Sequence, residues 1–273
     1  MARKHSCHSE RQSTARRPGR LTLLGAGALA ASAITAVAVT AGTAAAAPAA
    51  FTRPATTAAA ATTAAFTAPT RDLGLGAKGV DVKAVQERLA ALKYYPGAID
   101  GVLGADTQGA LWAFQEINGL KVTGTVTAQT GWALVHPKSY KSPDYKGRRA
   151  TRIEVNQALE VVVLYENNRI MLIAHCSSGG GYFFDGGTQA ITPNGTYNTT
   201  VYLPGWVTVP LGEMYNPVFF IGTVFAIHGD TVVPVGPASH GCVRVDMDIA
   251  AFFHKMVKTP GTQVHVYGTP QWE

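Results

Sequence analysis

The chain has 273 residues, enough for one or two domains, and its hydrophobic fraction of 47% is ordinary for a globular protein. The formal net charge is +6, but residues 1–47 hold six basic side chains against one acid, a net of +5 that leaves only +1 for the remainder. This distribution argues against nucleic acid or another polyanion as the partner of the folded part.

The first 47 residues have the pattern of an export signal. A basic stretch ends at Arg20, an uncharged apolar stretch covers residues 21–39, and small residues at 44–47 offer cleavage sites before Pro48. A membrane anchor is the alternative, because the apolar run is about long enough to span a bilayer, but its small and hydroxyl residues favour cleavage. We therefore expect a signal peptide at 1–47 and an exported, extracytoplasmic protein. The Arg16-Arg17 pair leaves the twin-arginine route open.

Residues 48–70 consist almost entirely of Ala, Thr and Pro, which predicts a disordered linker, because such a segment buries too little surface to fold. From residue 71 the apolar residues recur at helical spacing. Three short helices are expected, the first starting at Asp81, the second at Asp106 or Thr107 and ending at Gly119, and the third near Thr127. Residues 71–136 are thus predicted to form a small all-α domain.

This helical segment resembles a three-helix peptidoglycan-binding module. The motifs that carry the resemblance are Leu75-Gly76-Ala77-Lys78-Gly79, Val85-Gln86, Asp100-Gly101-Val102-Leu103-Gly104, Phe114-Gln115 and Asn118-Gly119-Leu120. The resemblance implies peptidoglycan as a binding partner. A generic helical bundle would explain the apolar spacing equally well.

Residues 137–149, rich in Lys, Pro, Tyr and Arg, are expected to form a linker, and beyond them the apolar period changes to two. Two β-rich runs surround Glu166-Asn167-Asn168, which predicts a hairpin turn. Further strands are expected at 197–202, 218–221, 224–228 and 263–267, and one late helix is expected to start at Asp248. Residues 150–273 are therefore predicted to form a mostly-β, β-sandwich-like domain.

The residues with the clearest chemistry lie late in this second domain. His228-Gly229-Asp230 is followed, after a short spacer, by Ser239-His240-Gly241-Cys242. A thiol becomes a good nucleophile when a nearby imidazole takes its proton, and a glycine lets backbone amides approach a carbonyl under attack. The pattern is typical of cysteine-dependent acyl transfer.

Two other interpretations of the same residues remain open at this point. His228, Asp230, His240 and Cys242 are all acceptable zinc ligands. Cys7 belongs to the signal, so Cys176 and Cys242 are the two cysteines of the mature chain and could form a disulfide after export.

Residues 150–268 resemble the catalytic domain of L,D-transpeptidases. The motifs that carry this resemblance are Thr192-Pro193-Asn194-Gly195-Thr196-Tyr197, Ala226-Ile227-His228-Gly229 and Ser239-His240-Gly241-Cys242-Val243-Arg244, and Cys176-Ser177-Ser178-Gly179 stands where the family has a Ser-Thr-Gly-like segment. The resemblance implies an enzyme of the cell wall that cross-links peptidoglycan stem peptides through a thioester, with no cofactor and no metal. It also implies covalent inhibition by carbapenems. The same chemistry ending in water, an L,D-carboxypeptidase, and a zinc-dependent wall peptidase are the alternatives.

The resemblance also implies a role for each motif residue. Cys242 is expected to be the nucleophile and His228 the general base, with the carbonyl of Gly229 orienting the imidazole. The amides of Gly241 and Cys242 are expected to stabilise the oxyanion, and His240 to line the site.

Two further motif residues are assigned to substrate binding. Ser239 is expected at the substrate, where it also positions the loop. Arg244 would hold a substrate carboxylate or support the loop, and we favour support.

Overall fold

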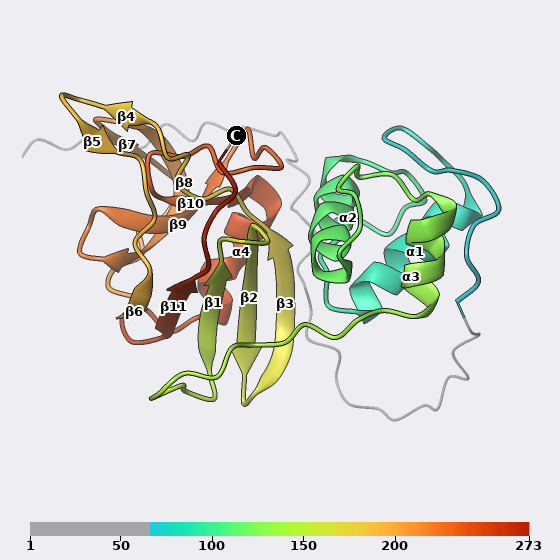
Figure 1. Cartoon of the computed structure of the whole chain (residues 1–273), viewed down its shortest axis with the longest axis horizontal. Helices are drawn as coiled ribbons and strands as arrows, with labels where there is room; N and C mark the ends of the chain where they lie inside the picture. The colour runs from blue at the N-terminus through green and yellow to red at the C-terminus, as the bar shows by residue number, and fades with distance from the viewer. Residues whose placement is uncertain (1–65, 273) are drawn as a thin grey trace, which may run out of the picture. The chain divides into compact units, whose positions relative to one another are not determined.

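A computed structural model describes residues 66–272. The expected signal peptide at 1–47 and residues 48–65 of the expected linker lie outside the described residues. The helices are α1 (Val80–Ala91), α2 (Ala105–Asn118), α3 (Ala128–Val135) and α4 (Met247–Met256) (Figure 1). The strands are β1 (Arg152–Asn156), β2 (Val161–Glu166), β3 (Arg169–His175), β4 (Phe183–Phe184), β5 (Thr188–Gln189), β6 (Gly195–Asn198), β7 (Trp206–Val209), β8 (Gly212–Ile221), β9 (Phe225–Asp230), β10 (Val243–Asp246) and β11 (Gln263–Tyr267). Within residues 66–272, no helix has the length and apolar character needed to cross a membrane.

The helices α1, α2 and α3 form the predicted all-α domain around one apolar core. Its fully buried side chains include Val82, Val85, Leu89, Leu111, Phe114 and Leu134. Two buried glutamines connect the helices to the turns that join them. The carboxamide of Gln86 donates to the carbonyl of Val102 and accepts from the amide of Gly101, and Gln115 makes the same pair of contacts with Thr125 and Gly124. The glycine-rich turns are therefore held by side chains of the helices that precede them.

The helix ends agree only in part with the sequence. The third helix begins near Thr127 as predicted, with the Thr127 hydroxyl accepting the amide of Thr130 as the cap, and Gly119 ends α2 with a φ of 68°. The predicted starts at Asp81, at Asp106 or Thr107 and at Asp248 are wrong, because Gly79, Gly104 and Asp246 hold the N-cap positions. Each aspartate lies instead in the first turn of its helix.

The β-domain has two main sheets, as the sandwich prediction required. The larger sheet has the order β3-β2-β1-β11-β6 and the smaller one β10-β9-β8-β7, while β4 and β5 form a separate hairpin (Figure 1). Both main sheets contribute to one core, together with α4. Its members include Ile153, Val162, Leu172, Val218, Ile227, Val245, Phe253 and Val264. The β2–β3 hairpin turns at Asn167 and Asn168, both with positive φ, as predicted.

The larger sheet is apolar on both faces. Alternate residues of β2, Val161 and Val163, together with Ile173 of β3, belong to the core of the helical domain. At this contact the ring of Trp112 on α2 meets the buried ring of His175 edge to face, with the ring centroids 5.2 Å apart. The near-continuous apolar run of β2 is explained by this burial on both faces.

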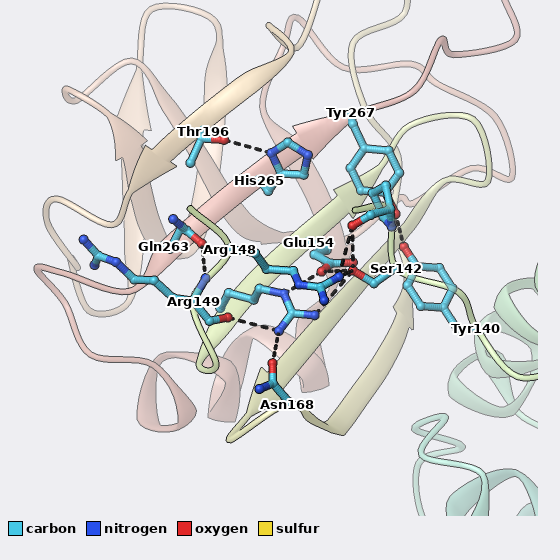
Figure 2. A network of polar contacts seen from close by, with 12 residues as sticks. Tyr140, Ser142, Arg148, Arg149, Glu154, Asn168, Thr196, Gln263, His265 and Tyr267 are labelled. Atoms are coloured by element: carbon cyan, nitrogen blue, oxygen red, sulfur yellow. Dashed lines mark hydrogen bonds and ion pairs between the residues drawn. The ribbon is translucent and has the colours of Figure 1, made fainter. Parts of the chain in front are cut away.

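Residues 137–149 contain no helix or strand, yet their side chains bind the β-domain. Figure 2 shows Tyr140 meeting the hydroxyl of Tyr267, and Ser142 donating to the buried carboxylate of Glu154 at 2.5 Å. Glu154 also pairs with Arg152 at 2.6 Å, with both side chains almost fully buried. The segment therefore packs along the larger sheet rather than hanging free between the domains.

Candidate active site

The two halves of the sequence motif meet on neighbouring parallel strands. In the register of β9 and β10, Arg244 pairs with His228 and Val243 with Ile227. Since side chains alternate between the two faces of a sheet, Cys242 and Arg244 share a face with Ala226 and His228. On this face Cys242 packs, partly buried, against a small cluster formed by Met214, Phe219 and Ala226. The register thus places the thiol diagonally across from the imidazole.

His228 is buried and is fixed by its own neighbour. Its side chain is 4% exposed, and Nδ1 lies 2.9 Å from the carbonyl oxygen of Gly229. Because that carbonyl can only accept, Nδ1 carries the proton and Nε2 is the basic nitrogen of the neutral ring. Burial lowers the pKa of His228, against the opposing effects of the Gly229 carbonyl and Asp230. The imidazole is therefore neutral and able to accept a proton at neutral pH.

Cys242 precedes β10, and its thiol donates weakly to the carbonyl of Val224 at 3.6 Å. Burial raises the pKa of the thiol, which the backbone at Ala226 and the charge of Arg244 partly offset. Ionisation of this thiol therefore needs a base.

Cys176 and Cys242 are both free thiols within residues 66–272. Cys176 is fully buried in the main core, and burial raises its pKa well above the ordinary value. Cys242 packs in a different cluster, so the disulfide interpretation is not realised in this structure.

Gly241 forms the turn that presents Cys242. Its φ is +135°, and a Cβ atom there would lie 2.6 Å from the carbonyl oxygen of Ile191 and 2.6 Å from the ring of Phe225. The carbonyl of Gly241 accepts the hydroxyl of Thr192 at 2.7 Å, and its amide donates to Ser239 Oγ at 2.9 Å. The amide expected to face an oxyanion is thus engaged inside the loop, and Gly241 contributes the shape of the turn.

The two residues assigned to substrate binding are engaged within the protein. Ser239 is 1% exposed, and its hydroxyl accepts the Gly241 amide while donating to the carbonyl of Cys242 at 2.5 Å. Arg244 pairs with Asp230 at 3.1 Å across the two strands. In this structure both side chains therefore make contacts within the protein, and their assignment to substrate binding stays a prediction.

Comparison with known proteins adds two family matches. Residues 78–134 match the model of a putative peptidoglycan binding domain, and residues 150–266 match that of the L,D-transpeptidase catalytic domain. The crystal structure of an L,D-transpeptidase from Xylanimonas cellulosilytica (residues 123–326) is similar to this chain, with a TM-score of 0.65 and 32% sequence identity. The match covers 74% of this chain and 98% of the Xylanimonas chain. The chain belongs to the L,D-transpeptidase family.

Other relatives share shorter segments with this chain. A spore cortex-lytic enzyme of Bacillus cereus is 35% identical over 116 residues, 38% of this chain and 45% of that protein. A spore cortex-lytic enzyme of Bacillus subtilis is 46% identical over 66 residues, 24% of this chain and 22% of that protein. The chain thus spans less than half the length of these curated relatives.

His240 of the transpeptidase motif lies between two aromatic rings. Tyr182 and Phe184 each meet it edge to face, with ring centroids 5.4 and 4.8 Å away. Phe184 belongs to the small β4–β5 hairpin, and Tyr182 immediately precedes it. Tyr182 is 40% exposed. Through its contacts with Tyr182 and Phe184, His240 connects the motif around Cys242 to the β4–β5 hairpin.

The zinc interpretation requires a cluster of ligands. No group of three or more His, Cys, Asp or Glu side chains in residues 66–272 is arranged to hold a metal ion. The four candidate ligands of the transpeptidase motif instead have other partners, such as Gly229 for His228 and Arg244 for Asp230.

Sequence reasoning gave no role to two residues that the structure connects to the motif around Cys242, although Thr192 is part of a motif named above. Thr192 accepts the amide of Gly179 and donates to Gly241, so it joins two loops. Glu160, directly before β2, binds Ser178 with both carboxylate oxygens. The sequence signal for Glu160 is a single acid directly before a long apolar run, because such an acid must find partners when the run is buried.

Proposed function

We propose that this protein is a cysteine-dependent L,D-transpeptidase that forms cross-links between peptidoglycan stem peptides outside the cytoplasm. The observation that carries the proposal is the register of β9 and β10, which brings Cys242 to the face of the sheet that holds His228. The hydrogen bond from Nδ1 to Gly229 supports the proposal, because it leaves Nε2 as the basic nitrogen.

In the first half-reaction, Nε2 of His228 takes the proton of Cys242, and the thiolate attacks the carbonyl between an L-centre and a D-residue of the donor peptide. The tetrahedral intermediate carries its negative charge near the amide of Cys242. When it collapses, the C–N bond breaks and the departing amine of the D-residue, D-alanine, takes the proton from His228. A thioester on Cys242 remains.

In the second half-reaction, the amine of an acceptor stem peptide attacks the thioester and gives a proton to His228. The C–S bond breaks, a new amide forms, and the Cys242 sulfur regains its proton from the imidazole. The enzyme returns to its starting state without redox change and without a metal or cofactor.

The test is intact-mass analysis after exposure to imipenem, whose strained lactam carbonyl is a substitute for the donor carbonyl. We expect one covalent adduct on the wild type and none on Cys242→Ala, with or without EDTA. A folded, reduced wild type that gains no mass, or an adduct that persists in Cys242→Ala, would contradict the thioester mechanism.

The alternative outcome of the same thioester is hydrolysis by an L,D-carboxypeptidase. Incubation of a tetrapeptide donor with and without a second stem peptide separates the two, since a transferase makes a cross-linked dimer and a hydrolase only a shortened donor. Solvent access to the thioester decides between them.

The helical domain is proposed to hold the enzyme on the wall and so raise the local concentration of substrate. Deleting the domain would expose the apolar face of β2 and β3, so a point variant is the better test. Trp132 on α3 is 63% exposed and stacks on His136. We expect Trp132→Ala to weaken co-sedimentation with purified peptidoglycan while imipenem labelling stays intact, and unchanged sedimentation would exclude Trp132 as a contact.

Export is proposed from the N-terminal pattern. Expression of the full chain in a bacterial host should give a mature protein in the extracytoplasmic fraction, with a new N-terminus close to residue 48. A full-length protein retained in the cytoplasm would contradict this.

A further inference from the structure

A second loop lies along the motif that contains Cys242. Ser177 and Arg244 exchange two backbone hydrogen bonds of 3.0 Å, and the amide of Gly180 donates to the carbonyl of Ser239 at 2.9 Å. Between these contacts, the carbonyl of Ser178 accepts the amides of both Ala238 and Ser239 at 2.9 Å. The position of the motif loop therefore depends on where residues 176–180 are held.

Ser178 is in turn held by the carboxylate of Glu160. One carboxylate oxygen accepts the Ser178 amide and the other its hydroxyl, both at 2.6 Å, and the carbonyl of Glu160 accepts the amide of Cys176 at 2.8 Å. Glu160 is 5% exposed and Ser178 is fully buried. Glu160 has a φ of +44°, a conformation that non-glycine residues seldom adopt unless surrounding contacts enforce it.

Burying a carboxylate at this position costs free energy, because the charged group loses its hydration. Burial raises the pKa of Glu160 to about 7, and the two hydrogen bonds from Ser178 act in the opposite direction. Its side chain satisfies two donors of Ser178 that an apolar residue would leave without partners in the protein interior. The Glu160 carboxylate therefore fixes the position of the Ser178 backbone.

The hydrogen bonds continue from that point to the nucleophile. The Ser178 carbonyl fixes Ser239, and the Ser239 hydroxyl joins the amide of Gly241 to the carbonyl of Cys242. Each step is a buried or partly buried hydrogen bond, so a shift at Ser178 is passed to the residues that present the thiol. A displacement of about 1 Å at a reacting group can lower a rate about a hundredfold.

We propose that Glu160 is a positioning residue for the nucleophile, acting through Ser178 to fix the loop from Ser239 to Cys242. This inference rests on the proposed function, since it assigns Glu160 a role in the acylation of Cys242. Glu160 touches neither the thiol nor the imidazole in any hydrogen bond of the described residues, so it is not a catalytic residue.

The experiment measures imipenem acylation at several drug concentrations, which separates the limiting rate from the concentration for half-saturation. Glu160→Ala should lower the limiting rate at least about tenfold and change half-saturation little, because the loop is misplaced and the cleft surface is not. Glu160→Gln should restore the rate to within about threefold, since its oxygen can accept the Ser178 amide and its nitrogen can donate to the hydroxyl. Ser178→Ala, which loses one of the two bonds, should fall between them.

The matched control is Glu154→Ala. Glu154, on β1 of the larger sheet, is also a buried carboxylate, but its hydrogen-bond partners are Arg152 and Ser142 (Figure 2) and not residues of the motif. Glu154→Ala should lower the temperature at the midpoint of unfolding without lowering the limiting acylation rate of the folded protein. The acylation rates of all variants are measured well below their midpoint temperatures.

The outcomes separate the two proposals. A wild type that imipenem does not label contradicts the proposed function, and the role of Glu160 falls with it. A labelled wild type with an equally fast Glu160→Ala, or no rescue by Glu160→Gln, or an equal loss in Glu154→Ala, contradicts the positioning role alone. If Glu160→Ala does not fold, Ser178→Ala decides, and a wild-type limiting rate in that variant overturns the inference.

Discussion

The Nδ1 atom of His228 lies 2.9 Å from the carbonyl oxygen of Gly229, the next residue in the chain. The imidazole is therefore oriented by an uncharged backbone group, where a catalytic triad uses a carboxylate. A neutral partner stabilises the protonated ring less than a carboxylate would, so the ring returns its proton readily to a departing amine.

Replacement of His228 by Gln should remove the base and keep most of the side-chain volume. We expect imipenem acylation of Cys242 to slow by about 10²–10⁴-fold, the usual contribution of a positioned base. The measurement is the rate of adduct formation by intact mass. His254→Gln, on α4 against Tyr202, is the control and should react like the wild type. Equal rates for His228→Gln and the wild type would show that another group takes the proton.

The acylation rate should fall as pH falls through the pKa of His228, because a protonated imidazole cannot accept the thiol proton. Burial lowers this pKa, so the acidic limb should lie below the ordinary value of about 6.5. Asp230 raises the pKa and Arg244 lowers it. Asp230→Asn removes the carboxylate and leaves Arg244 unpaired, so both changes should move the limb to still lower pH. A limb that moves upward would contradict the assignment of His228 as the base.

Gly241→Ala should both destabilise the protein and slow acylation. The added Cβ would lie 2.6 Å from a backbone oxygen, at a φ that L-residues rarely adopt, so the loop must shift. We expect a loss of about 1–3 kcal/mol in the free energy of unfolding. Gly236→Ala is the matched control, because a Cβ there would have no heavy atom within 4 Å. Urea unfolding and imipenem labelling check both expectations, and two indistinguishable variants would contradict the steric argument.

Stability should depend on pH through two aspartates, Asp106 and Asp246. Burial, with Asp248 nearby, raises the pKa of Asp106 to about 7 and that of Asp246 to about 6. A carboxyl whose pKa is raised in the folded state binds its proton more tightly there than in the unfolded chain. Its stabilising effect is therefore complete below about pH 4 and is lost as pH rises through 6 to 7.

Asp106→Asn removes one of these titrating groups. Because the group is partly exposed, solvent screening limits the effect, and we expect a gain of about 1 kcal/mol at pH 8 relative to the wild type, with little difference at pH 4. Urea unfolding at the two pH values provides the measurement. A variant whose stability changes with pH as much as that of the wild type would show that Asp106 does not carry the effect.

The parts of the site that sequence could predict are those that are contiguous in the chain. Gly229 follows His228 directly, and Gly241 precedes Cys242, so their contacts are local. Glu160 and Ser178 lie 18 residues apart, beyond the two ends of the β2–β3 hairpin. The sequence predicts the hairpin turn, but it does not specify the register, which shifts at Leu164 and Tyr165 and decides which residue faces Ser178. The predicted starts of the helices were wrong because contacts with residues outside the helix also decide which residue caps it. Asp81 has the right chemistry for a cap, but Arg71 binds its carboxylate in the first turn, and Gly79 takes the capping position.

Strand β11, the last strand within residues 66–272, does not lie at an edge of its sheet. It runs parallel to β1 and antiparallel to β6, between them in the larger sheet. A polypeptide is made and delivered from its N-terminus, so the helical domain can complete its core while the β-domain still lacks a central strand. The loop that holds Cys242 precedes β11 by about twenty residues and leads into the smaller sheet, which packs on the same core as β11. The shared core behind this loop therefore stays incomplete until β11 has paired with β1 and β6.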